Sequence, residues 1–180
     1  MPFRFTKRRS SERGFSILEM LLATIILLVG LIGVAQLVPA SILMNYRNRN
    51  DSSALVFAQR ELDQFLDQPL SISSFTDALG NICQLGDPAS PNVVLPSSSS
   101  VVVVNNQTLI NFGAAPVANY SFTYLDLTDP ARNTAYDVRW AVIVTGNGST
   151  VYGKRFIIGV RQQGGNGYFQ PITLDTMVQK

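Results

Sequence analysis

Few side chains in this sequence are suited to catalysis. The 180 residues include no histidine and a single cysteine, Cys83. Histidine is the commonest general base and a frequent metal ligand, so its absence removes both uses. One cysteine forms neither an intramolecular disulfide nor a cysteine-based metal cluster. Asp126 and Asp129 lie near a turn at Pro130 and are typical turn residues. We therefore expect a protein that is not an enzyme and has no cofactor and no metal site.

One carboxylate is unusual because of its surroundings. Glu19 lies one helical turn inside an apolar run over residues 15–44, and residues 20–46 contain no charge that could pair with it. A charged side chain inside a bilayer costs on the order of 2.5–3.5 kcal/mol unless it is paired. Glu19 therefore either pairs with a cation from another molecule or extends to the lipid headgroups from its place near the helix start.

The segment that carries Glu19 is long enough to cross a membrane. Met20 to Val38 are nineteen uncharged residues, roughly 28 Å of helix, which is close to the hydrocarbon thickness of a bilayer. Residues 1–14 form a basic leader, which places the N-terminus in the cytoplasm and the rest of the chain outside it. Val38-Pro39-Ala40 is a poor signal-peptidase site, so we expect the run to stay on the mature protein as a single-pass anchor.

The residues around the start of the apolar run form a recognisable motif. Arg13-Gly14-Phe15-Ser16-Ile17-Leu18-Glu19-Met20-Leu21 resembles the processing and methylation site of type IV prepilins. The resemblance implies that a membrane-embedded prepilin peptidase cuts after Gly14 and methylates the new amine of Phe15. It also implies that Glu19 of one subunit pairs with the Phe15 amine of a neighbouring subunit during assembly.

This resemblance implies a structural subunit of a type IV pilus, namely a minor pilin, and the lone Cys83 favours a minor subunit or a pseudopilin over a major pilin. The alternatives are a type II secretion pseudopilin and, from another class, a membrane-anchored extracytoplasmic enzyme. The implied partners are the prepilin peptidase, other pilin or pseudopilin subunits, an inner-membrane assembly platform and membrane lipid. After assembly the protein would lie in a cell-surface or periplasmic filament. Residues 45–180 carry nine basic and ten acidic side chains, so no nucleic-acid partner is indicated.

The predicted fold is α+β and pilin-like, with a long N-terminal helix packed on a C-terminal antiparallel sheet. After the membrane-spanning residues 15–44, an amphipathic half-helix covers residues 45–68 and Pro69 ends it. Its predicted apolar stripe, at helical spacing, contains Leu55, Ala58, Leu62, Phe65 and Leu66. The charged and polar side chains predicted on its exposed surface are Arg60, Glu61, Asp63 and Gln64.

The remaining residues are predicted to form strands. Residues 69–118 read as a loop-rich connection with short strands over 101–104 and 108–112 and a flexible tract over 96–100. Residues 119–180 read as an antiparallel sheet with strands over 120–127, 135–145, 150–161 and 168–174. Pairing Thr145 with Ser149 through a three-residue loop containing Gly148 places both apolar sets on one face. That register puts Arg139 opposite Arg155 on a solvated outer face.

Overall fold

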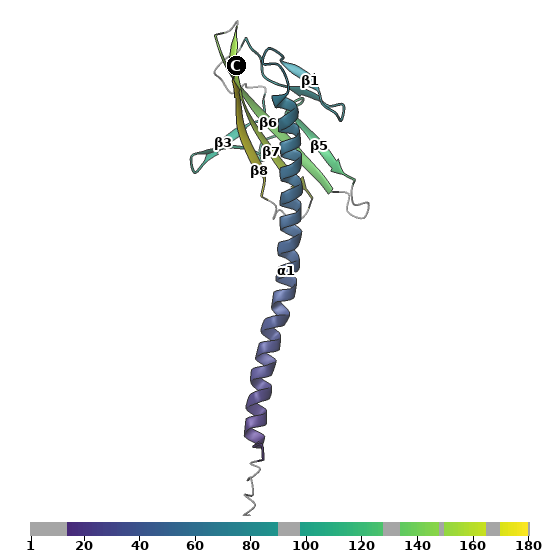
Figure 1. The fold of residues 1–180 in the computed structure, drawn as a ribbon, viewed down its shortest axis with the longest axis vertical. Helices are drawn as coiled ribbons and strands as arrows, with labels where there is room; N and C mark the ends of the chain where they lie inside the picture. Colours follow the sequence, from purple (N-terminus) through teal and green to yellow (C-terminus); the bar gives the residue numbers. More distant parts are fainter. Residues whose placement is uncertain (1–13, 90–97, 128–133, 148–149, 165–169, 180) are drawn as a thin grey trace, which may run out of the picture. The chain divides into compact units, whose positions relative to one another are not determined.

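A computed structural model describes residues 14–89, 98–127, 134–147, 150–164 and 170–179. The chain divides into two compact units, residues 1–45 and 46–180. Among the described residues, one long helix, α1 (Ile17–Leu66), is followed by eight strands in antiparallel sheets. Figure 1 shows the helix and the main sheet. The α+β class with a long apolar N-terminal helix is therefore confirmed.

The helix α1 has 50 residues and contains Pro39 within it, close to the predicted range of 15–68. It ends at Leu66, three residues before Pro69, because a residue that precedes proline is disfavoured in the helical conformation. The backbone amides of Glu19 and Met20 both donate to the Ser16 carbonyl at its start, at 3.0 and 3.1 Å.

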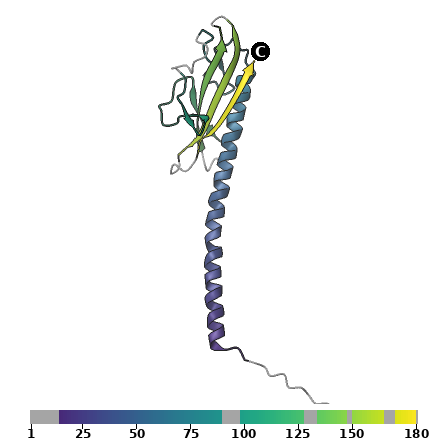
Figure 2. The ribbon, with the colours of Figure 1, turned by 90° about the vertical axis from the view of Figure 1, so that its left-hand side faces the viewer.

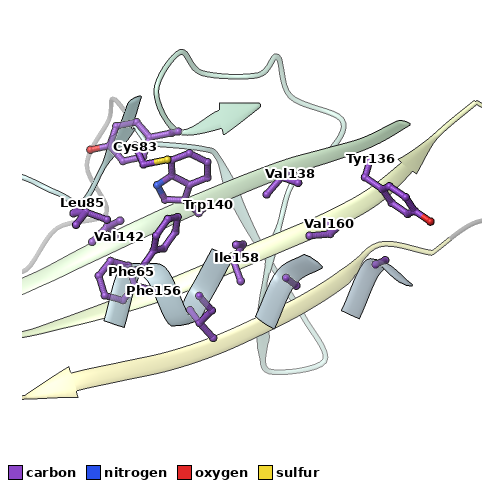
Figure 3. Close-up of a cluster of buried hydrophobic side chains, with 14 of the residues drawn as sticks. Phe65, Cys83, Leu85, Tyr136, Val138, Trp140, Val142, Phe156, Ile158 and Val160 are labelled. Carbon is purple, nitrogen blue, oxygen red and sulfur yellow. The ribbon is translucent and has the colours of Figure 1, made fainter. Parts of the chain in front are cut away.

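The main sheet has four antiparallel strands in the order β5-β6-β7-β8. Their bounds are Ser121–Asp126, Thr134–Gly146, Val151–Gln163 and Ile172–Gln179. In Figure 2 the C-terminal part of α1 lies along one face of this sheet. Between them lies the main core, where the ring centre of Phe65 is 5.2 Å from that of Trp140 and 5.6 Å from that of Phe156. Figure 3 shows these side chains in the core.

The apolar stripe of α1 is partly as predicted. Ala58, Leu62 and Phe65 are buried, but Leu55 is exposed and Glu61 is buried with 3% of its surface accessible. The prediction that Glu61 lies on the exposed surface is therefore wrong. Its place on the buried side follows from helical geometry, because Glu61 lies three residues after Ala58 and four residues before Phe65.

The predicted register of the β6–β7 hairpin is also wrong. Its faces are correct for Phe156, Ile158 and Val160, but a bulge next to the turn places Val151 against the core and leaves the predicted core residue Tyr152 exposed. Thr145 pairs with Gly153, not with Ser149, and Arg139 lies opposite Gly159, not opposite Arg155. The register differs from the predicted one by four residues. A slip of an even number of residues keeps every side chain on its own face, so the alternation of apolar residues could not distinguish the two registers. Gly148 and Ser149 lie outside the described residues.

The second face of the sheet is covered by a smaller hairpin. The strands β3 (Val101–Val104) and β4 (Gln107–Ile110) match the prediction, and both turn residues between them have positive φ, 49° at Asn105 and 65° at Asn106. Ile110 and Phe112 pack here on Ala141 and Ile157. A Cβ atom at Gly159 would lie 2.8 Å from the Ile110 Cβ, so only glycine permits this close approach.

The outer face is not the solvated surface that the sequence predicts. Asp137 and Arg139 are both buried, and Arg139 Nη2 lies 2.8 Å from Asp137 Oδ2. Arg161, from the neighbouring strand, lies 3.3 Å from the same oxygen. The guanidinium groups of Arg139 and Arg161 lie 5.1 and 4.7 Å from the Phe112 ring centre. The hairpin thus covers these charges, because it brings Phe112 over them.

Two further features lie between residues 69 and 118. A short hairpin that the sequence analysis missed joins β1 (Ser74–Thr76) to β2 (Ile82–Gln84). Ser98 and Ser99 are buried, and the Ser99 amide donates to the Trp140 carbonyl. The prediction of a flexible serine tract is therefore wrong for the described residues 98–100. Asp126 ends β5, whereas Asp129 and Pro130 lie outside the described residues.

Candidate functional site

The predicted cleavage site lies directly before α1. Gly14 and Phe15 are exposed and precede the first helical residue, Ile17. A Cβ atom at Gly14 would meet no atom within 4 Å, and the Phe15 side chain is 73% exposed. The Gly14–Phe15 peptide bond is therefore outside the helix and open to an approaching enzyme.

Glu19 lies in the first turn of α1 and is exposed. No ion pair of Glu19 occurs within the described part of the chain. Ser16 directly precedes the helix, so Ser16-Ile17-Leu18-Glu19 follows the capping-box pattern, in which the glutamate stabilises a helix N-terminus. No side-chain hydrogen bond between Ser16 and Glu19 occurs among the described residues, and the only bond between the two is from the Glu19 amide to the Ser16 carbonyl.

The first part of α1 has the properties of a membrane-spanning helix. It contains an 18-residue window with a mean hydropathy of 2.7, and none of that window is buried within the structure. Its hydroxyl groups are paired with the helix itself, since Thr24 Oγ1 donates to the Leu21 carbonyl and Ser41 Oγ to the Val38 carbonyl. A hydroxyl that is satisfied in this way is tolerated in lipid.

The buried acid Glu61 is a site that the sequence analysis did not find. Burial, and next the negative charge of Asp77, raise the pKa of Glu61 to about 7, while Arg60 and the nearby Gln64 amide act in the opposite direction. Glu61 Oε2 is buried and has no hydrogen-bond partner among the described residues. Asp77 is also buried, but it accepts bonds from Leu79 N and from both nitrogens of Asn81.

Cys83 lies beside this acidic pair in the core and is fully buried. Burial raises the pKa of its thiol to about 12, with further contributions from Asp77 and Glu61. A reactive cysteine needs a thiolate near neutral pH, so Cys83 has the environment of a core residue and not that of a nucleophile.

One cleft of the C-terminal unit has a volume of about 590 Å³. No titratable side chain is found among its described lining residues, which are Gln68, Pro69, Leu70, Ser71, Pro88, Thr150, Val151 and Gln179. Within the described part of the chain, no group of three or more potential metal-ligating side chains occurs. The features that remain distinctive are Gly14, Phe15 and Glu19 at the start of an apolar helix.

Comparison with protein-family models, with curated proteins and with solved structures found no match to this chain.

Proposed function

We propose that this protein is a filament subunit of the prepilin type, and specifically a minor pilin of a type IV pilus. It is inserted in the cytoplasmic membrane with residues 1–14 in the cytoplasm and its C-terminal domain outside. A prepilin peptidase removes residues 1–14 and methylates the Phe15 amine. The mature chain then enters a filament through the apolar part of α1.

The observation that carries this proposal is the arrangement at the start of α1. An exposed Gly14–Phe15 bond lies directly before a helix whose apolar N-terminal part packs against none of the described residues. Cleavage there creates an amine four residues before Glu19, in the same low-dielectric layer. That amine and the Glu19 carboxylate of a second subunit can neutralise each other, which offsets the cost of placing either charge in lipid.

The C-terminal domain supports a role in protein contact and not in catalysis. The cleft of about 590 Å³ beside Pro69 has no titratable lining residue among those described, and the Cys83 thiol is buried in the core. Cys83 is the only cysteine of the chain, so no intramolecular disulfide closes a C-terminal loop. Many major pilins have such a disulfide, and this difference favours a minor subunit.

Replacement of Glu19 tests the charge-pairing step. Glu19→Gln keeps the size of the side chain but removes its charge, so cleavage should persist while incorporation into filaments falls at least about tenfold. The measurement is the amount of the subunit in sheared filaments relative to its membrane pool. Thr24→Val is the matched control, because Thr24 bonds only to its own helix at Leu21, and it should assemble normally. Equal incorporation of Glu19→Gln and the wild type would overturn the pairing mechanism.

A further inference from the structure

We propose that the protonation state of Glu61 controls how tightly the β1–β2 hairpin closes over α1. The hairpin has three residue pairs and forms its own two-stranded sheet. Hairpins of this size are marginally stable alone, so its position depends on its contacts with the rest of the domain. Glu61 lies where those contacts are made.

The hairpin is attached to α1 through the residues next to Glu61. The ring of Phe75 on β1 packs edge-on against that of Phe65, with centres 5.9 Å apart. The amide of Ala78, in the turn, donates to Gln64 Oε1 at 3.1 Å. Glu61 itself is 3% exposed, so water cannot reach its carboxyl group while the hairpin is closed.

The groups around Glu61 favour its neutral form. The titratable or charged groups that act on it are Arg60 from α1, Asp77 from the hairpin turn and Cys83 from β2. Arg60 Nε is 4.0 Å from Glu61 Oε1 and its side chain is 41% exposed, so it compensates a buried charge only weakly. Asp77 already accepts three hydrogen bonds from its own turn.

Ionisation of Glu61 would therefore place two carboxylates close together under the hairpin. The Glu61 Oε2 atom has no hydrogen-bond partner among the described residues, so only Arg60 and the Gln64 amide oppose the cost of the new charge. Opening the hairpin admits water to this carboxylate and removes the repulsion from Asp77. The protonated form, by contrast, leaves a neutral carboxyl group that is much less costly to bury. The hairpin is accordingly tight at acidic pH and looser near neutral pH.

The direction of the pH dependence follows from proton linkage. The closed state has the raised pKa of about 7, and an open, hydrated Glu61 has the ordinary value of 4.5. The closed state thus binds more protons between these two values. The opening equilibrium should increase by up to about tenfold per pH unit from pH 4.5 to pH 7 and become constant above pH 7.

Cys83 provides the probe for this experiment. It lies on β2, is fully buried and is the only thiol of the chain, so its modification reports opening of the hairpin. The full-length protein in detergent is labelled with dithiodipyridine, which reacts with thiols at acidic as well as neutral pH. Dividing the wild-type rate by that of Glu61→Gln at each pH removes the intrinsic pH dependence of the reagent and the thiol.

The rate ratio should rise about sevenfold between pH 5.5 and pH 6.5, while the helical circular dichroism stays constant. Arg60→Gln removes a positive charge that lowers the Glu61 pKa, so the labelling rate of this variant should keep rising to a higher pH than that of the wild type. This comparison does not use Glu61→Gln, so it remains valid if that variant does not fold. Asp63→Asn changes an exposed acid on the same helix and should match the wild type. A ratio independent of pH, or a loss of helix in parallel with labelling, would refute the proposal.

Discussion

The buried amine of Lys154 on β7 donates a hydrogen bond to the backbone carbonyl of Ile72, which lies 82 positions earlier in the chain. This bond connects the segment that follows α1 to the core face of the main sheet. It is one of several long-range bonds here, since Trp140 Nε1 donates to the Gln84 carbonyl at 2.9 Å. The domain is thus held by contacts within residues 46–180.

A fragment of residues 45–180 should therefore be soluble and folded. The buried residues of α1 all lie between Asn50 and Phe65, so removing the apolar part of the helix removes nothing from the core. Sedimentation should show a soluble species, and circular dichroism should show both helix and strand. A matched fragment of residues 68–180 lacks Ala58 and Phe65 and should not fold. An insoluble or unfolded fragment 45–180 would contradict the division of the chain into two units.

Lys154 should give this fragment a stability that rises with pH above 8. Burial lowers the pKa of Lys154 from 10.5 to about 8, so the unfolded chain binds more protons than the folded one between these values. The free energy of unfolding should increase from pH 8 to pH 9.5 by at most about 2 kcal/mol. Urea titrations should show a more positive slope in the wild type than in Lys154→Met, in which stability falls above pH 9 because the pKa of the Cys83 thiol is raised by burial. Equal slopes for both proteins would show that Lys154 is not responsible.

The two ion-pair clusters of the sheet should differ in their contribution to stability. Asp137 is buried and pairs with Arg139 and Arg161, so Asp137→Asn leaves two cations without a counter-ion. We expect a loss of roughly 3 kcal/mol in the free energy of unfolding. The Arg155–Asp175 pair is more than a third exposed on both sides, and Asp175→Asn should cost less than about 1 kcal/mol. Equal losses in the two variants would mean that Asp137 is hydrated in solution.

Much of the fold is predictable from local patterns. The run of uncharged residues from Met20 to Val38 and the strand alternation around Trp140 give the helix and the long strands. The Asn105-Asn106 turn gives the β3–β4 hairpin, because asparagine tolerates the positive φ that such a turn needs. Each of these signals depends on neighbours in the sequence and needs no knowledge of the tertiary structure.

The errors concern contacts between distant segments. Glu61 was assigned to the surface by its charge, yet it is buried, and Asp77 from the turn between β1 and β2 raises its pKa. Arg139 was assigned to solvent, although Phe112 lies over it from another hairpin. The β6–β7 register could not be fixed, since a four-residue shift preserves both faces, and what selects it includes the fit of Gly159 under Ile110. Tertiary packing therefore determines the burial of these side chains and the register of the two strands, which the periodicity of the sequence does not predict.

The processing of the N-terminus tests the central claim most directly. Intact mass spectrometry of the protein extracted from membranes of cells that carry a prepilin peptidase should show a chain that begins at N-methylated Phe15. Gly14→Val should abolish this cleavage, while Gly30→Val, inside the apolar helix, should leave it unchanged. A mature protein that still begins at Met1 in such cells, or that begins beyond Val38, would contradict the assignment as a prepilin-type subunit.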